Sequence, residues 1–192
     1  MTGNGKGKEY DYDGELEFEG EYFNGERNGK GKEYNYDELI FEGEYLNGKR
    51  WNGKFLNENG IIEYEINNGN GKGKEYDSDG KLKYEGEYLN GERNGKGKEY
   101  DYYGELKFEG EYLNGERWNG KIKEYDYNGE LKFEGEYLKG ERNGNGKEYD
   151  YEGKLWFDGE YLNGKRNGYG KEYDFNGNIA YEGKYLNGFK IY

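Results

Sequence analysis

The sequence predicts an all-β chain, an elongated and twisted single-layer antiparallel sheet of tandem β-hairpins without helices. A short aromatic motif returns at nearly constant spacing, and polar and aromatic residues alternate on both sides of turns that contain glycine. Only 31% of the 192 residues are hydrophobic, and 19% of all residues are aromatic. This composition excludes a conventional aliphatic core, whereas alternation with a period of two is typical of strands that bury one face.

The repeats account for nearly the whole chain. The pentapeptide aromatic, Glu or Asp, Gly, Glu or Lys, Tyr occurs seven times, first at 18–22 and last at 181–185. A degenerate copy around Glu63-Tyr64 fills the single long interval. We therefore expect one repeat domain, residues 1–192, because internal repeats of this length are typical of repeat architectures. Its eight units begin at Asn-Gly and span 4–27, 28–51, 52–69 (shortened), 70–93, 94–118, 119–142, 143–166 and 167–192.

Each unit is predicted to form one hairpin. In the fifth unit, residues 98–102 and 106–112 alternate on either side of Gly104. Asp-Gly and Asn-Gly pairs at the equivalent turns, such as Asp13-Gly14 and Asn128-Gly129, tolerate the positive φ of tight turns. Counting the alternation through the turn assigns two faces. One face holds Tyr100, Tyr102, Leu106, Phe108, Gly110 and Tyr112, and the other holds Glu99, Asp101, Lys107, Glu109 and Glu111.

The glycine inside each pentapeptide lies between two aromatic neighbours on the predicted apolar face. Glycine within a strand often marks a close approach of other groups. We expect a side chain here to collide with neighbouring rings. The predicted structural glycines are Gly20, Gly43, Gly86, Gly110, Gly135, Gly159 and Gly183.

The aromatic face is also the candidate binding surface. Its side chains could line a groove for an extended peptide or a glycan, or they could be the thin core of the fold, packing ring on ring. Both interpretations stay open, since a single-layer sheet leaves such a face partly uncovered. The candidate residues are Tyr10, Tyr12, Phe18, Tyr22, Tyr34, Tyr36, Phe41, Tyr45, Tyr76, Tyr84, Tyr88, Tyr100, Tyr102, Phe108, Tyr112, Tyr125, Tyr127, Phe133, Tyr137, Tyr149, Tyr151, Phe157 and Tyr161.

Composition also argues against several kinds of catalysis and binding. The chain has no His and no Cys, which removes imidazole bases, thiol nucleophiles and zinc–thiolate sites. Paired carboxylates such as Glu109 and Glu111 recur along a solvated face, so they are interpreted as cross-strand charge pairs rather than a catalytic dyad. The Gly-rich runs are interpreted as turns rather than phosphate cradles, and the Asp-rich turns lack the closing Glu of a calcium loop. We expect no catalytic residue, no metal and no cofactor.

Two irregularities interrupt the repetition. The shortened unit 52–69 carries the aliphatic residues Phe55, Leu56, Ile61, Ile62 and Ile66; it is a kink or a private docking patch, or else a deletion that the repeat array tolerates. Trp51 and Trp118 each stand before Asn-Gly as a one-residue insertion, which predicts a bulge at both places.

The recurring 14-residue segments, such as 84–97, resemble the membrane occupation and recognition nexus (MORN) repeat. Aromatic-Glu-Gly spacing, an Asn-Gly-Lys turn and a Gly-x-Gly strand start carry the likeness over about residues 4–188. The 24-residue period is more similar to the MORN-variant repeat type. The resemblance implies a rod of stacked hairpins used for scaffolding, dimerisation and protein contacts, with lipid binding proposed for some members.

We therefore expect a non-enzymatic scaffold that presents its aromatic face to a protein partner or to a second copy of itself. The net charge of −13 favours a basic partner and argues against nucleic acid and anionic membranes. The alternatives are a carbohydrate-binding module of Tyr-rich hairpins and peripheral membrane association. No apolar stretch of membrane-spanning or signal-peptide type occurs, so a cytoplasmic location is expected.

Overall fold

The computed structural model describes residues 4–77, 79–126 and 128–192, and it divides the chain into two compact units, 1–105 and 106–192. All regular structure among the described residues is β-strand. No described segment forms a helix long and apolar enough to cross a membrane. The residue Tyr127, one of the predicted binding residues, lies outside the described residues.

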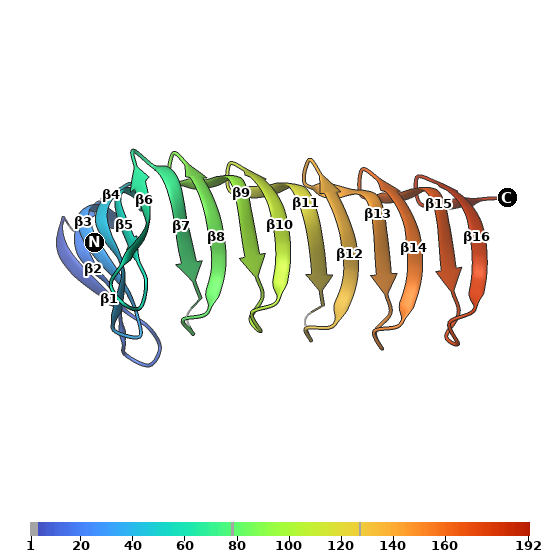
Figure 1. The fold of residues 1–192 in the computed structure, drawn as a ribbon, viewed down its shortest axis with the longest axis horizontal. Coiled ribbons are helices and arrows are strands. Elements are labelled where there is room, and N and C mark those ends of the chain that lie inside the picture. Colours follow the sequence, from blue (N-terminus) through green and yellow to red (C-terminus); the bar gives the residue numbers. More distant parts are fainter. Residues whose placement is uncertain (1–3, 78, 127) are drawn as a thin grey trace. The chain divides into compact units, whose positions relative to one another are not determined.

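The first unit is an antiparallel sheet in which each strand pairs with the next one along the chain (Figure 1). Its strands are β1 (Gly5–Tyr10), β2 (Leu16–Phe23), β3 (Glu26–Asn35), β4 (Glu38–Leu46), β5 (Lys49–Leu56), β6 (Ile62–Asn67), β7 (Asn70–Tyr76), β8 (Leu82–Leu89) and β9 (Glu92–Tyr100).

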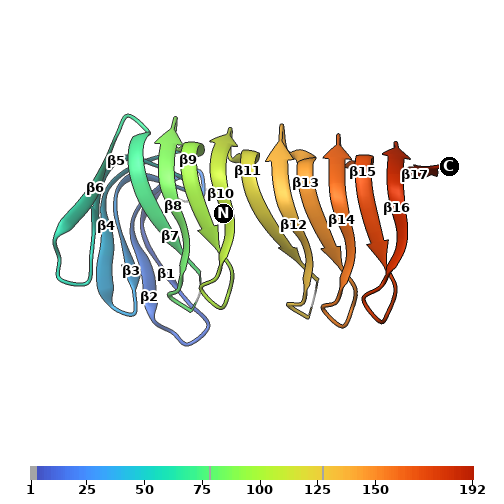
Figure 2. The same cartoon turned by 45° about the vertical axis from the view of Figure 1, so that its right-hand side comes forward.

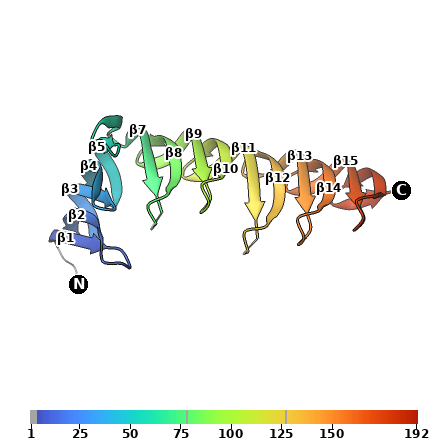
Figure 3. The ribbon, with the colours of Figure 1, turned by 60° about the horizontal axis from the view of Figure 1, so that its bottom comes forward.

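The second unit is built in the same way. Its strands are β10 (Leu106–Leu113), β11 (Glu116–Tyr125), β12 (Leu131–Leu138), β13 (Glu141–Tyr149), β14 (Leu155–Leu162), β15 (Lys165–Tyr173), β16 (Ile179–Leu186) and β17 (Phe189–Ile191). Strands β11 to β16 bow along their length, and their Asp-x-x-Gly turns lie along one edge while the two-residue turns, Lys139-Gly140 and Asn163-Gly164, lie along the other (Figures 1 and 3). The predicted all-β class, a single-layer antiparallel sheet of tandem hairpins, is confirmed within each unit.

Register fixes which side chains share a face. Opposite residues of an antiparallel pair lie on the same side of the sheet. Within the first unit Glu99 of β9 lies opposite Tyr84 of β8, and Lys98 lies opposite Glu85. Glu99 therefore shares the face of the pentapeptide aromatic, and Tyr100 points to the opposite face.

The predicted faces are thus right for the pentapeptide strand and wrong for the strand that precedes it. The alternation was counted through the turn, and a β-bulge breaks that count. Between β7 and β8, Glu75 pairs with Tyr84 while the next residue, Tyr76, pairs with Leu82, so one residue of β8 has no counterpart. Such a bulge shifts the alternation by one residue. Tyr102 lies in the turn after β9 and belongs to neither face.

The two tryptophan insertions are bulges, as predicted. Tyr45 pairs with Arg50 and Glu44 with Asn52, which leaves Trp51 as the extra residue of β5. Tyr112 pairs with Arg117 and Glu111 with Asn119, which leaves Trp118 in the same position of β11.

The shortened repeat interrupts the ladder of the first unit. Among the described residues, β6 pairs with β7 only at Ile66–Gly71 and Asn67–Asn70, and the two strands then diverge (Figures 1 and 2). Ile66 is buried there, as is Phe55 of the neighbouring strand, whereas Ile61 and Ile62 are exposed. The pairing break accompanies the shortened repeat, and a docking role for this segment stays a prediction.

Candidate functional site

The face that carries the pentapeptide aromatics is a packed core in both units. Ten of the predicted binding residues are buried here: Phe18, Phe41, Tyr45, Tyr84, Tyr88, Phe108, Tyr112, Phe133, Phe157 and Tyr161. Phe157 meets Tyr161 of its own strand edge-on at 5.7 Å between ring centroids and meets Tyr185 of the next hairpin at 5.3 Å. Edge-to-face packing of this kind adds to the energy of burial. These buried rings are therefore covered by contacts within the fold and form its core.

Glycines form the floor beneath these rings. A Cβ added to Gly159 would lie 2.6 Å from the Cα of Gly170 on the next strand and 2.6 Å from Cζ of Phe157. The other predicted structural glycines are equally crowded, although Gly183 meets only the ring of Tyr181. The close neighbours are the ring of the same strand, except at Gly110, and the backbone of the adjacent strand, except at Gly183. Only glycine lets the backbones and rings approach this closely.

A row of Glu, Arg and Tyr side chains lies over the aromatic rings. Glu148 of β13 accepts hydrogen bonds from Nε and Nη2 of Arg166, at 3.1 and 2.7 Å, and one from the Tyr161 hydroxyl. Nη1 of Arg166 also reaches Glu172 of its own strand, β15, at 2.9 Å. The guanidinium carbon lies 4.0 Å from the ring centroid of Phe157. Charged hydrogen bonds and a cation–π contact thus join consecutive hairpins.

This arrangement shifts the pKa values of the glutamates and of the tyrosines in the row, in opposite directions. Burial alone would raise the pKa of Glu148, but hydrogen bonds from Arg166 and Tyr161 outweigh burial and hold that pKa below its ordinary value. Burial and the hydrogen bond to Glu124 raise the pKa of Tyr137 to about 12. Glu148 therefore stays ionised and Tyr137 stays protonated near neutral pH.

The Glu–Arg row was not predicted from the sequence. The signal was present, because a Glu recurs directly before the last Tyr of each Gly-x-Gly strand, and an Arg recurs after most Asn-Gly turns. The error in strand alternation placed these glutamates on the solvated face. The row repeats at Glu9–Arg27, Glu33–Arg50, Glu75–Arg93, Glu124–Arg142 and Glu148–Arg166.

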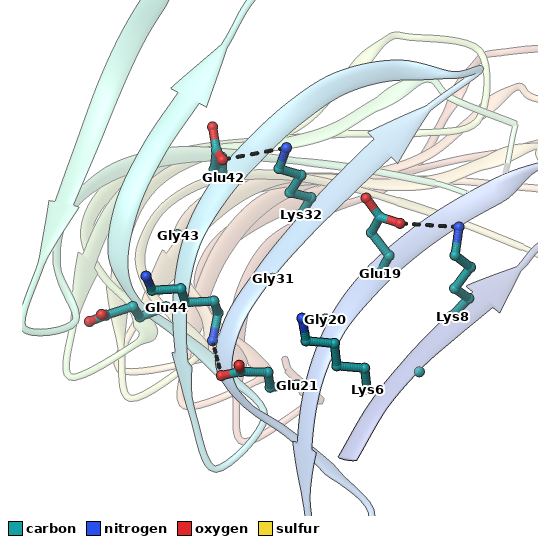
Figure 4. A pocket seen from close by; sticks show the side chains of 12 residues that line it. Lys6, Lys8, Glu19, Gly20, Glu21, Gly31, Lys32, Glu42, Gly43 and Glu44 are labelled. Atoms are coloured by element: carbon teal, nitrogen blue, oxygen red, sulfur yellow. Dashed lines mark hydrogen bonds and ion pairs between the residues drawn. The ribbon is translucent and has the colours of Figure 1, made fainter.

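The opposite face is covered by lysine and glutamate. Lys8 pairs with Glu19 at 3.1 Å and Lys32 with Glu42 at 3.5 Å, and each pair joins cross-strand neighbours as predicted for charge pairs. Figure 4 shows these side chains in alternating rows over Gly20, Gly31 and Gly43, where they line a hollow of about 810 Å³. Oppositely charged neighbours largely neutralise one another on this face.

The other predicted binding residues divide into three groups. Tyr34, Tyr100 and Tyr149 donate to Glu19, Glu85 and Glu134 on the charged face, at 2.9, 2.9 and 2.6 Å. Tyr22, Tyr76, Tyr125 and Tyr137 are half-buried. Five are exposed, at the strand end before an Asp-x-x-Gly turn or at the turns themselves: Tyr10, Tyr12, Tyr36, Tyr102 and Tyr151.

Three of the exposed tyrosines, Tyr12, Tyr102 and Tyr151, sit on turns of one recurring geometry, whereas Tyr10 ends β1 and Tyr36 lies in a two-residue turn between β3 and β4. In the turn 150–154, the Asp150 amide donates to the carbonyl of Lys154 at 2.9 Å, and Oδ1 of Asp150 accepts from the amides of Glu152 and Lys154, both at 2.9 Å. The carboxylate thereby replaces part of the backbone bonding, as in an Asx turn. The residue after the Asp, here Tyr151, projects into solvent.

Among residues 4–77, 79–126 and 128–192, no group of three or more acidic side chains is arranged to hold a metal ion. The surfaces that remain accessible are the Lys–Glu face and the aromatic turns.

Comparison with known families agrees with the repeated hairpins. The family model described as MORN repeat matches the chain at four places, residues 18–37, 84–102, 133–154 and 157–179. A search of curated proteins gave no significant match. The four matched segments each begin at a buried pentapeptide aromatic and run through the Gly-x-Gly strand that follows. The chain is therefore a MORN repeat protein.

Proposed function

We propose that this chain is a non-enzymatic scaffold that binds a protein partner, or a second copy of itself, through the exposed aromatic side chains of its Asp-x-x-Gly turns. The MORN repeats indicate a repeat-type scaffold. The observation that carries the finer proposal is the recurrence of an exposed ring at the same turn position, as at Tyr12, Tyr102, Tyr151 and Phe175. Exposed aromatic side chains that recur in this way are typical of interaction surfaces.

The buried rings are a poor choice for the contact. Phe157 would have to leave the glycine floor, Arg166 and two tyrosines before it could touch a partner. The exposed turn rings need no such opening. The proposal therefore moves the contact from the whole predicted aromatic face to the turn edge of each unit.

A non-enzymatic role is supported by the partners of the carboxylates whose pKa values are shifted. Glu148 and Glu33 have lowered pKa values and are bound by arginine and tyrosine in the row over the core. Lowered pKa values of this kind accompany structural ion pairs as well as active sites. Here the same pairing recurs along each unit, which supports a structural role.

Light scattering coupled to size-exclusion chromatography is the first test, run over a range of protein concentrations. The wild-type chain is compared with a turn variant (Tyr12→Ala, Tyr102→Ala and Tyr151→Ala) and with an edge variant (Leu113→Ala, Leu138→Ala and Leu162→Ala). The three leucines are exposed at the ends of β10, β12 and β14, next to the two-residue turns Asn114-Gly115, Lys139-Gly140 and Asn163-Gly164. A self-associating wild type should become monomeric only in the turn variant.

If the wild type is monomeric, affinity capture of partners is compared across the same three proteins. Loss of the captured protein in the turn variant alone is the expected result. Equal capture by wild type and turn variant, or equal loss in both variants, would contradict the assignment to the turn edge. A glycan array with the same proteins separates the carbohydrate-binding alternative, since exposed rings also stack on sugars; hits that require Tyr151 would replace the scaffold proposal.

A further inference from the structure

One turn of the first unit already holds a lysine side chain. Nζ of Lys81 lies 3.5 Å from the ring centroid of Tyr102 and donates a hydrogen bond to the carbonyl oxygen of Tyr102 at 3.1 Å. Lys81 is the last residue of one Asp-x-x-Gly turn, and Tyr102 is the second residue of the next such turn. The ring face and the carbonyl together accept a single ammonium group.

The second unit repeats the geometry of these two turns. In the turns 77–81 and 126–130 the first amide donates to the last carbonyl at 2.9 Å, and the same holds for the turns 101–105 and 150–154. Between the paired turns the register is also the same. Tyr84 lies opposite Glu99 in the first unit, and Phe133 lies opposite Glu148 in the second. Tyr151 therefore stands to Glu130 as Tyr102 stands to Lys81.

Position 130 carries a carboxylate where position 81 carries an ammonium group. The ring of Tyr151 is correspondingly more open, at 77% exposed against 57% for Tyr102. No cation–π contact to Tyr151 occurs within the part of the chain that the structure describes. The second unit thus presents an uncovered ring, Tyr151, in the position that accepts a lysine in the first unit, together with the carboxylate of Glu130, whose charge is opposite to that of an ammonium group.

We infer that Tyr151 and Glu130 form a binding site for a lysine side chain of a protein partner. The ammonium group lies over the Tyr151 ring, donates to the Tyr151 carbonyl as Lys81 does to that of Tyr102, and is neutralised by Glu130. This inference rests on the proposed scaffold function and names the chemistry of its partner. The net charge of −13 attracts cationic segments to the chain as a whole, and the turn gives that attraction a specific contact.

The probe for this site is an acetylated and amidated Gly-Gly-Lys-Gly-Gly peptide, titrated into the full chain while the aromatic NMR signals of the tyrosine rings are followed. A single lysine avoids the non-specific binding that polylysine would show to an acidic protein. We expect saturable shifts of the Tyr151 ring signals, and none with the same peptide acetylated on the lysine side chain. Tyr151→Leu should weaken binding about threefold, the ratio that an exposed cation–π contact supplies.

Two substitutions use the internal example directly. Glu130→Lys should place the chain's own lysine over Tyr151 and abolish the peptide shifts there. Glu141→Lys makes the same change of charge at an exposed residue next to the Lys139-Gly140 turn, away from the aromatic turn, and should leave most of the binding in place. Lys81→Ala should vacate the ring of Tyr102 and create a second set of peptide-dependent shifts.

Three results would overturn the lysine site. One is an equal loss of peptide binding in Glu130→Lys and Glu141→Lys, which would mean attraction by net charge alone. The others are Tyr102 signals that the peptide leaves unchanged in Lys81→Ala, and peptide-dependent shifts in the wild type that never involve Tyr151. A partner or self-association that requires the turn rings but survives Glu130→Lys would remove the lysine site and leave the scaffold function standing. If the peptide binds at Tyr151 but the chain neither self-associates nor captures a partner protein, the scaffold function is removed and the lysine site stands.

Discussion

At the scale of single residues, the glycine floor is the most demanding feature of the fold. Gly159→Ala puts a methyl group 2.6 Å from a backbone Cα and 2.7 Å from the carbonyl oxygen of Tyr169, and neither group can rotate away. We expect the substitution to lower the free energy of unfolding by about 3 kcal/mol, at the upper end for overpacking. Urea denaturation measures it.

The matched control is Gly153→Ala. That site has open space around the added Cβ, but its φ of +75° disfavours any side chain. The cost there should be about 1 kcal/mol, which is the left-handed strain alone. Equal urea midpoints for the two variants would show that crowding at Gly159 has been overestimated.

Acidic residues of the row over the core link stability to pH. Hydrogen bonds from Arg166 and Tyr161 lower the pKa of Glu148 in spite of its burial, so the folded chain binds its proton less readily than the unfolded chain does. The stabilisation is therefore complete above the unfolded pKa, near 4.3, and is lost as the pH falls through the lower folded value. Burial and the bond to Glu9 raise the pKa of Tyr22 to about 12, so its contribution is lost as the pH rises above about 10.

Unfolding free energies measured in urea at pH 7, 4 and 3 test the acid limb. Glu148→Gln should cost about 2 kcal/mol at pH 7, since a charged hydrogen-bond acceptor is lost. The variant should then lose less stability than the wild type between pH 7 and pH 3, because one titrating group has been removed. Parallel pH profiles would contradict the role given to Glu148.

At the scale of elements, the Asp-x-x-Gly turn depends on one carboxylate oxygen. Oδ1 of Asp150 accepts two backbone amides, and Asn57 makes the same two bonds, each at 3.0 Å, in the shortened repeat. We expect Asp150→Ala to lower the free energy of unfolding by about 1 kcal/mol, as loss of a comparable helix cap does. Asp150→Asn should be close to neutral in the same thermal or urea melts, because an amide oxygen already does this work at Asn57.

Strand boundaries and turn chemistry could be predicted from the sequence because alternation and Asp-Gly or Asn-Gly pairs are local signals. Phe108, Gly110 and Tyr112 were placed on one face correctly for that reason. The faces of Glu99 and Tyr100 depend on a bulge in the partner strand, which the alternation of their own strand does not contain. The contact of the Tyr102 ring with a lysine likewise depends on Lys81, which lies one turn earlier, so it can be found only from the register of the strands.

At the scale of the whole chain, each unit is held together by contacts between neighbouring hairpins. Phe157 meets the tyrosine of the next hairpin, and Arg166 of β15 bonds Glu148 of β13 as well as Glu172 of its own strand. Contacts of this range make stability a sum of repeat and nearest-neighbour contributions. The packing of one hairpin then has little influence on hairpins several repeats away.

Arg166→Ala tests this locality. It removes two ion pairs and the stack on Phe157 and leaves Glu148 and Glu172 without that guanidinium, at a cost of about 3 kcal/mol. Hydrogen exchange followed by mass spectrometry should show faster exchange in β13 to β16 and unchanged exchange in β2 to β4.

Arg27→Ala is the mirror experiment at the other end of the chain. The Arg27 guanidinium bonds Glu9 and lies 4.0 Å from the Phe18 ring centroid, so its loss should give faster exchange in β1 to β4 only. Acceleration spread evenly over all strands in either variant would mean that the chain opens as one cooperative body, and nearest-neighbour additivity would then fail for this protein.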